Sequence, residues 1–425
     1  MKHLQTKTRR SDKANAILLA VLVVVGLATS VKADAVSDWN AIAVQATVTA
    51  ARPGPSGVLD IAMVHAAIYD AVQAIEGEYQ PYYVDIPGAG GSPVAATAKA
   101  AHDVLVNRFP AQAAALDVAY QNYLTANGIS SNDKGITVGE RAAAAIISSR
   151  ACDGSFPNPA PTPFVGGTGI GEWRPTPPAN SAMNPGPWLG VVKPFTLTRP
   201  SQFRSPPPPR LTSRQYAVDY NEVKSLGALN STTRTAAQTD QAQFWAGNFV
   251  VMMNALVRQL SDSQVDGIAD TSRLFALTSM AQADAIITVW NDKANYNFWR
   301  PITAIQNGHL DGNARTIGDP AWTPLIATPP YPDYSSGANG LTGSTMRTLE
   351  NYFENDDIKF SITTTNTGPT NDDTRYFVSF SGAAQEVVDA RILLGIHFRF
   401  ADEASRTIGY RVADHVSHNV FKPVN

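Results

Sequence analysis

Proline is concentrated in one stretch of this 425-residue chain: residues 154–209 hold 15 of its 29 prolines. Proline lacks the amide donor that a helix needs and clashes with the preceding turn, so no regular helix can continue through this stretch. We therefore expect an extended segment that wraps over a helical body. Trp173 and Trp188 would anchor it as an ordered cover, which forms either a structural strap or the rim of a site entrance.

The regions on either side of the proline-rich stretch carry apolar residues at spacings of three and four, which is typical of amphipathic helices. Two short segments, 358–364 and 374–380, predict a β-hairpin. The sequence thus predicts an all-α fold, a large helical bundle of one or two merged four-helix bundles with a long proline-rich cover. The predicted helices span residues 38–50, 58–75, 93–108, 111–126, 137–152, 212–226, 231–260, 263 or 266–295, 341–353, 382–400 and 402–421.

Residues 1–33 are predicted to be a secretory signal peptide, with a basic start, an apolar core at 16–28 and a cleavage site at Val31-Lys32-Ala33. An uncleaved membrane anchor is the alternative, but the apolar core is shorter than the ~20 residues that span a bilayer. No other segment is expected to cross a membrane. The protein is therefore expected to be secreted or periplasmic, with residues 34–425 forming a single helical domain.

Charge and cysteine content exclude some classes of partner. Residues 34–425 contain 27 basic and 35 acidic residues, a net charge of about −8, which argues against nucleic acid or an acidic membrane surface as a partner. The single cysteine, Cys152, excludes an intramolecular disulfide and a cysteine metal site. Stability must then come from the core, and the 44% hydrophobic content is sufficient for a large one.

Lys293 and Arg300 lie seven residues apart, just before the helix-breaking Pro301. Seven residues are about two helical turns, so a continuous helix would place both cations on one face, where they can hold one anion. A solvated basic face is the simpler interpretation of such a pair.

Two further segments carry polar groups next to apolar helical patterns. Ser336 and Gly337 precede the predicted helix at 341–353, and a helix start offers a hydroxyl and free N–H groups to an anion. Taken alone, this is only a helix cap. Arg391 and His397 lie six residues apart on the predicted helix at 382–400, where a buried arginine needs a partner.

Together, in this order, the three segments resemble the superfamily of type-2 phosphatidic acid phosphatases and vanadium-dependent haloperoxidases. Its signature is a lysine, six residues and Arg-Pro; then Pro-Ser-Gly-His; then Ser-Arg, five residues and a histidine. The phrases at 331–334 and 395–400 are similar to the secreted bacterial haloperoxidase branch. The residues that match the signature are Lys293, Arg300, Pro301, Ser336, Gly337, Arg391 and His397.

The resemblance implies an oxyanion cradle within residues 285–400 that holds vanadate, or phosphate in the same place. It implies positive charge from Lys293, Arg300 and Arg391, a hydroxyl from Ser336 and an N–H from Gly337. His397 is implied as the metal ligand and catalytic residue.

The implied activity is oxidation of halide by hydrogen peroxide. One alternative is a metal-free acid phosphatase that acts on a phosphate ester through a phosphohistidine at His397. A second is a catalytically weakened oxyanion-binding homologue.

Four positions depart from the signature. Ala338 replaces the acid–base histidine, and this replacement favours the weakened homologue; we expect its methyl group to face the cradle beside Ser336. Asn339 is adjacent but cannot transfer a proton at neutral pH. The other departures are Ser335 for proline, Ala390 for serine, and an acid at Asp402 rather than one position earlier.

The remaining candidates have simpler interpretations. His65 and His102 are expected to be core or surface residues, and His415 with His418 lacks a third metal ligand. The aromatic residues of 244–249 are expected to pack in the core, with a halide or substrate pocket as the alternative: Phe244, Trp245 and Phe249.

Overall fold

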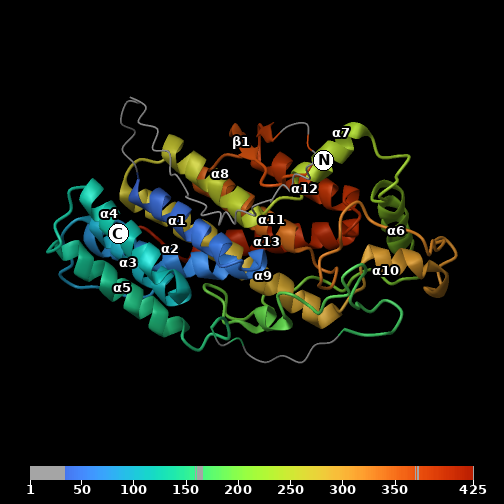
Figure 1. Ribbon diagram of the computed structural model, residues 1–425, viewed down its shortest axis with the longest axis horizontal. Helices are drawn as coiled ribbons and strands as arrows, with labels where there is room; N and C mark the ends of the chain where they lie inside the picture. The colour runs from blue at the N-terminus through green and yellow to red at the C-terminus, as the bar shows by residue number, and fades with distance from the viewer. Residues whose placement is uncertain (1–33, 158, 160–165, 369, 371–372, 425) are drawn as a thin grey trace, which may run out of the picture. The chain divides into compact units, whose positions relative to one another are not determined.

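The computed structural model describes residues 34–157, 159, 166–368, 370 and 373–424. The described residues form thirteen α-helices, three short 3-10 helices and one two-stranded sheet, which confirms the all-α prediction (Figure 1). The predicted signal peptide lies outside the described residues. The helices are α1 (Ala35–Thr49), α2 (Gly54–Glu76), α3 (Pro93–Arg108), α4 (Ala113–Ala126), α5 (Lys134–Arg150), α6 (Arg214–Leu226), α7 (Ala236–Phe244), α8 (Phe249–Gln264), α9 (Ile268–Tyr296), α10 (Pro301–Gln306), α11 (Gly337–Phe353), α12 (Phe380–Leu393) and α13 (Arg399–Asn419).

Helix α9 is the central element of the described residues. It packs against α2, which contacts α3 and α5, and it also packs against α11 and α13 (Figure 1). Nearly every residue of α9 from Leu274 to Lys293 is buried. By length and composition α2 would also qualify as a membrane span, contrary to the expectation that no segment after residue 33 does, but 89% of that apolar window is buried inside the protein.

Glycines bring α11 and α13 into close contact. A Cβ atom at Gly409 would lie 2.5 Å from the backbone nitrogen of Ser344, and one at Gly343 would lie 3.0 Å from the carbonyl oxygen of Arg406. Any larger side chain at Gly409 would therefore push the helices apart. This close packing fixes the start of α11 against the start of α13, where Ser336 donates its backbone N–H to the Ala401 carbonyl at 3.1 Å.

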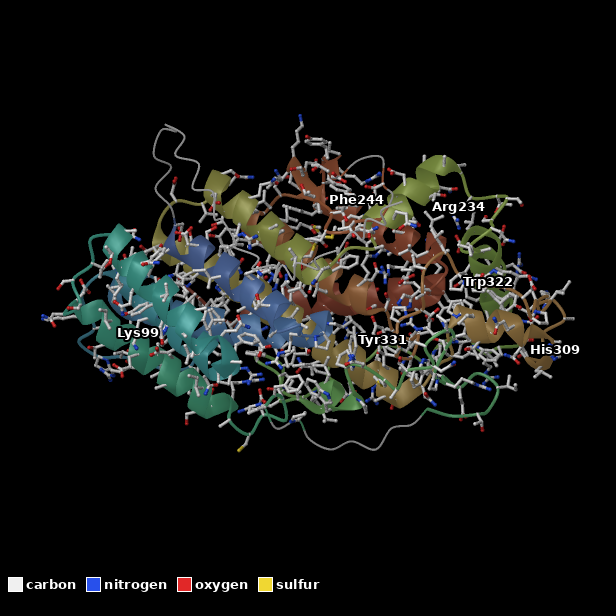
Figure 2. All side chains as sticks on the ribbon, viewed as in Figure 1. Lys99, Arg234, Phe244, His309, Trp322 and Tyr331 are labelled. Atoms are coloured by element: carbon white, nitrogen blue, oxygen red, sulfur yellow. The ribbon has the colours of Figure 1, made fainter. Side chains whose placement is uncertain are left out.

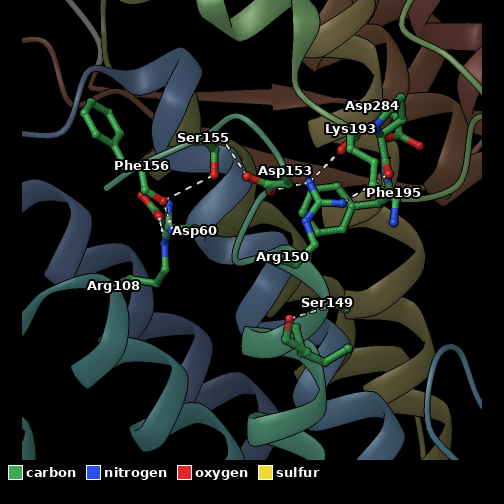
Figure 3. A network of polar contacts seen from close by, with 12 residues as sticks. Asp60, Arg108, Ser149, Arg150, Asp153, Ser155, Phe156, Lys193, Phe195 and Asp284 are labelled. Atoms are coloured by element: carbon green, nitrogen blue, oxygen red, sulfur yellow. Dashed lines mark hydrogen bonds and ion pairs between the residues drawn. The ribbon is translucent and has the colours of Figure 1, made fainter. Parts of the chain in front are cut away.

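The described part of the proline-rich stretch is an ordered cover, as predicted, and its regular structure is one 3-10 helix, η2 (Pro187–Val191). Asp284 on α9 accepts the backbone N–H groups of Phe195, Thr196 and Leu197 at 2.6, 2.7 and 3.1 Å. Arg150 donates to the Pro194 carbonyl at 3.1 Å and pairs with Asp153, so this cover is tied to α5 as well as to α9 (Figure 3).

The predicted helix at 231–260 is wrong, because the chain forms two helices there. A capping box of Thr235 and Gln238 starts α7 later than predicted. The Asn248 side chain accepts the Val250 N–H at 3.0 Å and starts α8. An apolar pattern continues through the break, so the periodicity alone did not reveal it.

The predicted helix at 382–400 is also wrong. Helix α12 ends at Leu393, and Gly395 adopts a φ of 78°, which favours glycine. A Cβ at Gly395 would lie 2.3 Å from the Gly227 carbonyl oxygen. Arg391 therefore lies in the last turn of α12, while His397 lies in the loop before α13.

Lys293 and Arg300 do not share a helix face, contrary to the prediction. Helix α9 ends at Tyr296, and Asn297 has a φ of 47°. Arg300 has an extended backbone and precedes α10. The predicted hairpin is present as β1 (Phe360–Thr363) paired antiparallel with β2 (Thr374–Phe377).

Candidate functional site

The Arg300 side chain joins three segments that are distant in sequence. Its Nη1 donates to the Ile396 carbonyl at 2.6 Å and lies 3.1 Å from Nε2 of His397. Its Nε donates to the Tyr331 carbonyl at 2.7 Å. Arg300 and His397 are both buried. The loops around residues 300, 331 and 397 therefore meet at one point.

Lys293 reaches the same point from the last turn of α9. Its Nζ donates to the carbonyl oxygens of Pro332 and Asp333 at 2.6 and 3.3 Å. Burial, followed by the nearby Arg300 charge, holds the pKa of Lys293 well below its ordinary value. The two cations thus converge through their side chains, although their backbones belong to different elements.

His397 has a carboxylate partner that the sequence did not identify. Its Nδ1 lies 2.7 Å from Oδ1 of Asp333, and both side chains are buried. Burial and the charges of Arg300, Lys293 and Arg391 hold the pKa of His397 well below its usual value, so the ring is neutral at neutral pH. Burial raises the pKa of Asp333 to about 7, against the opposing effect of Arg300 and Lys293.

Nδ1 of His397 and Oδ1 of Asp333 are close, although neither oxygen of the buried Asp333 side chain has a hydrogen bond of good geometry among the described residues. A proton on Nδ1 would leave the lone pair of a neutral imidazole on Nε2. That lone pair faces Nη1 of Arg300 at 3.1 Å, so a metal or an electrophile would take the place of this contact. The only sequence signal for Asp333 was its position in the Pro-Asp-Tyr phrase, directly before the Ser-Gly turn.

Ser336 and Gly337 lie where α11 begins, as predicted. The Ser336 hydroxyl lies 3.4 Å from the Asn339 amide nitrogen and is hydrogen-bonded to Asp402. A Cβ at Gly337 would lie 3.2 Å from the Trp290 ring, so glycine lets the helix start pack closely against this ring. The first N–H groups of a helix have no partner within it and are suited to an anion.

Two arginines of the predicted cradle each have a buried guanidinium nitrogen without a hydrogen-bond partner among the described residues: Nη2 of Arg300 and Nε of Arg391. Arg391 was expected to need a partner, and its Nη1 donates to the Trp245 carbonyl at 3.2 Å. Buried polar groups are almost always hydrogen-bonded. A bound oxyanion could accept hydrogen bonds from these two unpaired N–H groups, because charged oxygens are strong acceptors for guanidinium donors.

A cavity of about 290 Å³ lies next to Arg391 and His397. Arg391, His397, Gly337 and Ala338 line it, so Ala338 faces the same space as His397. Lys293, Arg300 and Ser336 are fully buried and are not part of its lining. Most of the remaining wall is apolar, and these residues are Pro55, Phe249, Val250, Ile286, Ile326, Pro329 and Leu341.

The six residues expected to form the oxyanion cradle thus meet at the cavity or directly behind its lining. Their roles in binding stay predictions. Asn339, which was considered a poor substitute for the missing histidine, lies away from the cavity lining and donates to Asp402 at 2.8 Å. Burial raises the pKa of Asp402 well above its ordinary value.

The structure also shows where the other candidate aromatic and histidine residues lie. Phe249 lines the cavity, whereas Phe244 and Trp245 pack in the core. His65 is buried and hydrogen-bonded to Asn40, and burial lowers its pKa to about 3. No group of three or more His, Cys, Asp or Glu side chains suited to a metal occurs in the described part of the chain, His415 and His418 included.

Comparisons with known proteins agree with this geometry. The family described as the VCPO second helical-bundle domain matches residues 273–425, which include the whole predicted cradle. Vanadium chloroperoxidase of Curvularia inaequalis is 27% identical over 289 residues. That alignment covers 52% of this chain and about half of the relative, 47% of its length.

Solved structures share the fold. A bacterial vanadium-dependent iodoperoxidase superposes with a TM-score of 0.76 at 22% identity, covering 91% of this chain and 97% of the other. A bacterial vanadium-dependent chloroperoxidase in its apo form gives a TM-score of 0.70 at 18% identity, covering 86% and 93% of the two chains.

Proposed function

We propose that this chain, which is similar to vanadium haloperoxidases in sequence and in fold, is a vanadate-dependent haloperoxidase-like enzyme that oxidises halide with hydrogen peroxide. The observation that carries this proposal is the environment of His397. Its imidazole is held neutral, lies 2.7 Å from the Asp333 carboxylate and lines a cavity whose two neighbouring arginines have unpaired N–H groups.

The residues present fit vanadate, a tetrahedral oxyanion. Nη2 of Arg300 and Nε of Arg391 are buried donors that lack a described partner, and charge-assisted donors are what such an anion requires. Lys293, Ser336 and Gly337 would hold further oxygens, and Nε2 of His397 would ligate the metal. Bound vanadate would supply a Lewis acid that activates hydrogen peroxide toward halide.

The chain's own residues would prepare the site for this chemistry. Asp333, whose Oδ1 lies 2.7 Å from Nδ1 of His397, would hold a proton on that nitrogen and so keep the lone pair on Nε2. Arg300 is held in position by the carbonyls of Tyr331 and Ile396. The apolar wall of the cavity limits water near the cationic groups, which strengthens their interaction with a bound anion.

Two alternatives remain, each with its own observation. The same donors and the Nε2 lone pair of His397 would suit a metal-free phosphatase that forms a phosphohistidine. Ala338 on the cavity wall favours a weakened oxyanion-binding homologue, because the superfamily's acid–base histidine is missing there. Loss of a general acid commonly costs about two to four powers of ten in rate.

The test is an assay of the purified protein for oxidation of chloride, bromide and iodide by hydrogen peroxide, with and without added vanadate, beside hydrolysis of phosphate esters. We expect halide oxidation that depends on vanadate. His397→Ala should abolish it and weaken vanadate binding, while the exposed His418→Ala serves as the control. Activity that is independent of vanadate, or that survives in His397→Ala, would contradict the proposal.

A further inference from the structure

The cavity lacks an acid–base group at position 338, so another side chain must supply protons if the site is catalytic. Among the residues that line the cavity, only Tyr331, Arg391 and His397 carry a titratable side chain. Arginine stays protonated in proteins. The two ring nitrogens of His397 face Asp333 and Arg300. Tyr331 is the remaining candidate.

Tyr331, whose place in the molecule is labelled in Figure 2, contacts two cations of the predicted cradle. Its carbonyl accepts Nε of Arg300 at 2.7 Å, and its ring centroid lies 4.9 Å from Nζ of Lys293 and 4.9 Å from Cζ of Arg300. The ring also packs at 5.1 Å against Trp290. These contacts fix the backbone and the ring plane together.

The Tyr331 side chain also faces the arginines that have unpaired donors. The guanidinium of Arg300 lies over its ring, and both Arg300 and Arg391 interact with it electrostatically. Tyr331 is only half-buried, so its side chain reaches the cavity as well as the cations. An oxyanion held between Arg300 and Arg391 would therefore lie beside this side chain.

We propose that Tyr331 is the proton donor of this site and replaces the histidine that position 338 lacks. This inference rests on the proposed function, because it requires an oxyanion bound by Arg300 and Arg391. In the step, the phenol O–H bond would break and its proton would pass to the leaving hydroxyl or ester oxygen. The bond of that oxygen to the oxyanion centre would break as hydrogen peroxide, or Nε2 of His397 in the phosphatase alternative, takes its place, and the leaving group would depart as water or alcohol. The phenolate keeps the electron pair beside the two guanidinium groups and regains a proton from solvent.

Tyr331→Phe tests the inference, because it removes the hydroxyl but keeps the ring that packs on Trp290. Tyr334→Phe is the matched control: Tyr334 lies three residues away, donates its hydroxyl to the Pro206 carbonyl at 2.7 Å and is outside the cavity lining. The full-length protein is used, and circular dichroism checks that each variant is folded.

Two quantities are measured, the affinity for orthovanadate by equilibrium dialysis and the turnover of halide at saturating vanadate. Loss of a hydrogen bond to a charged group predicts about tenfold weaker vanadate binding in Tyr331→Phe. Loss of the acid predicts a turnover lower by about 100-fold or more. Tyr334→Phe should stay within about twofold of the wild type in both. Adding Ala338→His to Tyr331→Phe should recover turnover by about tenfold or more, since it restores an acid by the other route.

Unchanged binding and turnover in Tyr331→Phe overturn the inference. Equal losses in both tyrosine variants also overturn it, because they indicate a structural role of the loop. If the wild type binds vanadate but oxidises no halide, the proposed function fails, and the turnover of a phosphate ester by Tyr331→Phe, compared with Tyr334→Phe, decides the inference. A wild type that binds neither vanadate nor phosphate overturns both.

Discussion

Ala338 leaves a space in the cavity wall at the position where the superfamily signature has an acid–base histidine. The methyl group faces the same cavity as Arg391 and His397. An imidazole at this position would point into open space rather than into the contact between α11 and α13, which lies on the glycine face of α11. The residue is therefore replaceable without disturbing the helix packing.

Ala338→His should raise peroxidase or phosphatase turnover by about tenfold or more, because it returns an acid–base group to a cradle that is otherwise present. Steady-state kinetics at saturating vanadate measure the effect. Ala338→Gln, of similar size but unable to transfer a proton, should give no gain. If Ala338→His has no effect and His397→Ala keeps its activity, this cradle is not the active site.

Asp333→Ala should lower vanadate affinity by about 10- to 100-fold, since groups that orient a metal-ligating histidine commonly contribute this much. The His397 ring would lose the partner at 2.7 Å that fixes its Nδ1 proton. Asp333→Asn, which keeps the shape and an acceptor oxygen, should lose less. Equilibrium dialysis measures both, and an affinity unchanged in Asp333→Ala would show that Asp333 does not orient the ligand.

The resemblance to the superfamily signature predicted the six cradle residues, but it did not predict the contact of Asp333 with His397. A carboxylate between Pro332 and Tyr334 has the appearance of an ordinary turn residue. Its importance comes from His397, 64 positions later, and from the carbonyl contacts to Lys293. Contacts of this kind depend on tertiary packing, and no local pattern encodes them.

The segments between helices determine the site more than the helices themselves do. Lys293 and Arg300 are separated by the end of α9, and Arg391 and His397 by the end of α12. Apolar periodicity predicted that the second pair lies within one helix, because the pattern continues across the break. The break depends on Gly395, whose close approach to Gly227 is a tertiary contact. Sequence patterns therefore identified the elements better than their ends.

Asp284→Ala should destabilise the protein by about 3 kcal/mol, because three backbone N–H groups of the proline-rich cover would lose a charged acceptor. Denaturant unfolding measures this. Limited proteolysis should cut near residues 190–200 faster in the variant. Asp319→Ala, at an exposed turn, is the control and should change stability by less than about 1 kcal/mol. Equal stability of the two variants would show that Asp284 does not hold the cover.

Across the described molecule, the sequence was sufficient for the fold class and for most helices, but not for the way in which they pack. The close contact of α11 with α13 depends on Gly343 and Gly409. From the sequence, a glycine within a helix is recognised only as a residue of low helix propensity. The buried carboxylates were equally unpredictable, because the burial of a helical aspartate is decided by its neighbours. Asp219 on α6 is such a case: its side chain accepts the N–H of Phe400 at 3.0 Å.

The stability of the whole molecule should depend on pH through Asp219. Burial raises its pKa to about 6, so between pH 4 and 6 the folded protein binds a proton that the unfolded chain has lost. Its contribution is present below about pH 4 and is lost as the pH rises through about 6. The free energy of unfolding should therefore fall as the pH rises from 4 to above 6. Asp219→Asn should make this fall smaller by roughly 1 kcal/mol, after allowance for solvent screening. Urea unfolding at pH 4, 5, 6 and 7 compares the two proteins, and identical pH profiles would contradict the prediction.

The meeting of the loops at residues 300, 331 and 397 also has a consequence during protein synthesis. When residue 350 has been translated, Lys293, Arg300 and Ser336 have been synthesised, but neither Arg391 nor His397 exists. The nascent chain can fold its first helices around α2, but the anion-binding centre cannot assemble until the final tenth of the chain has been made. Premature chains and early folding intermediates would therefore lack the oxidising chemistry proposed for the finished protein.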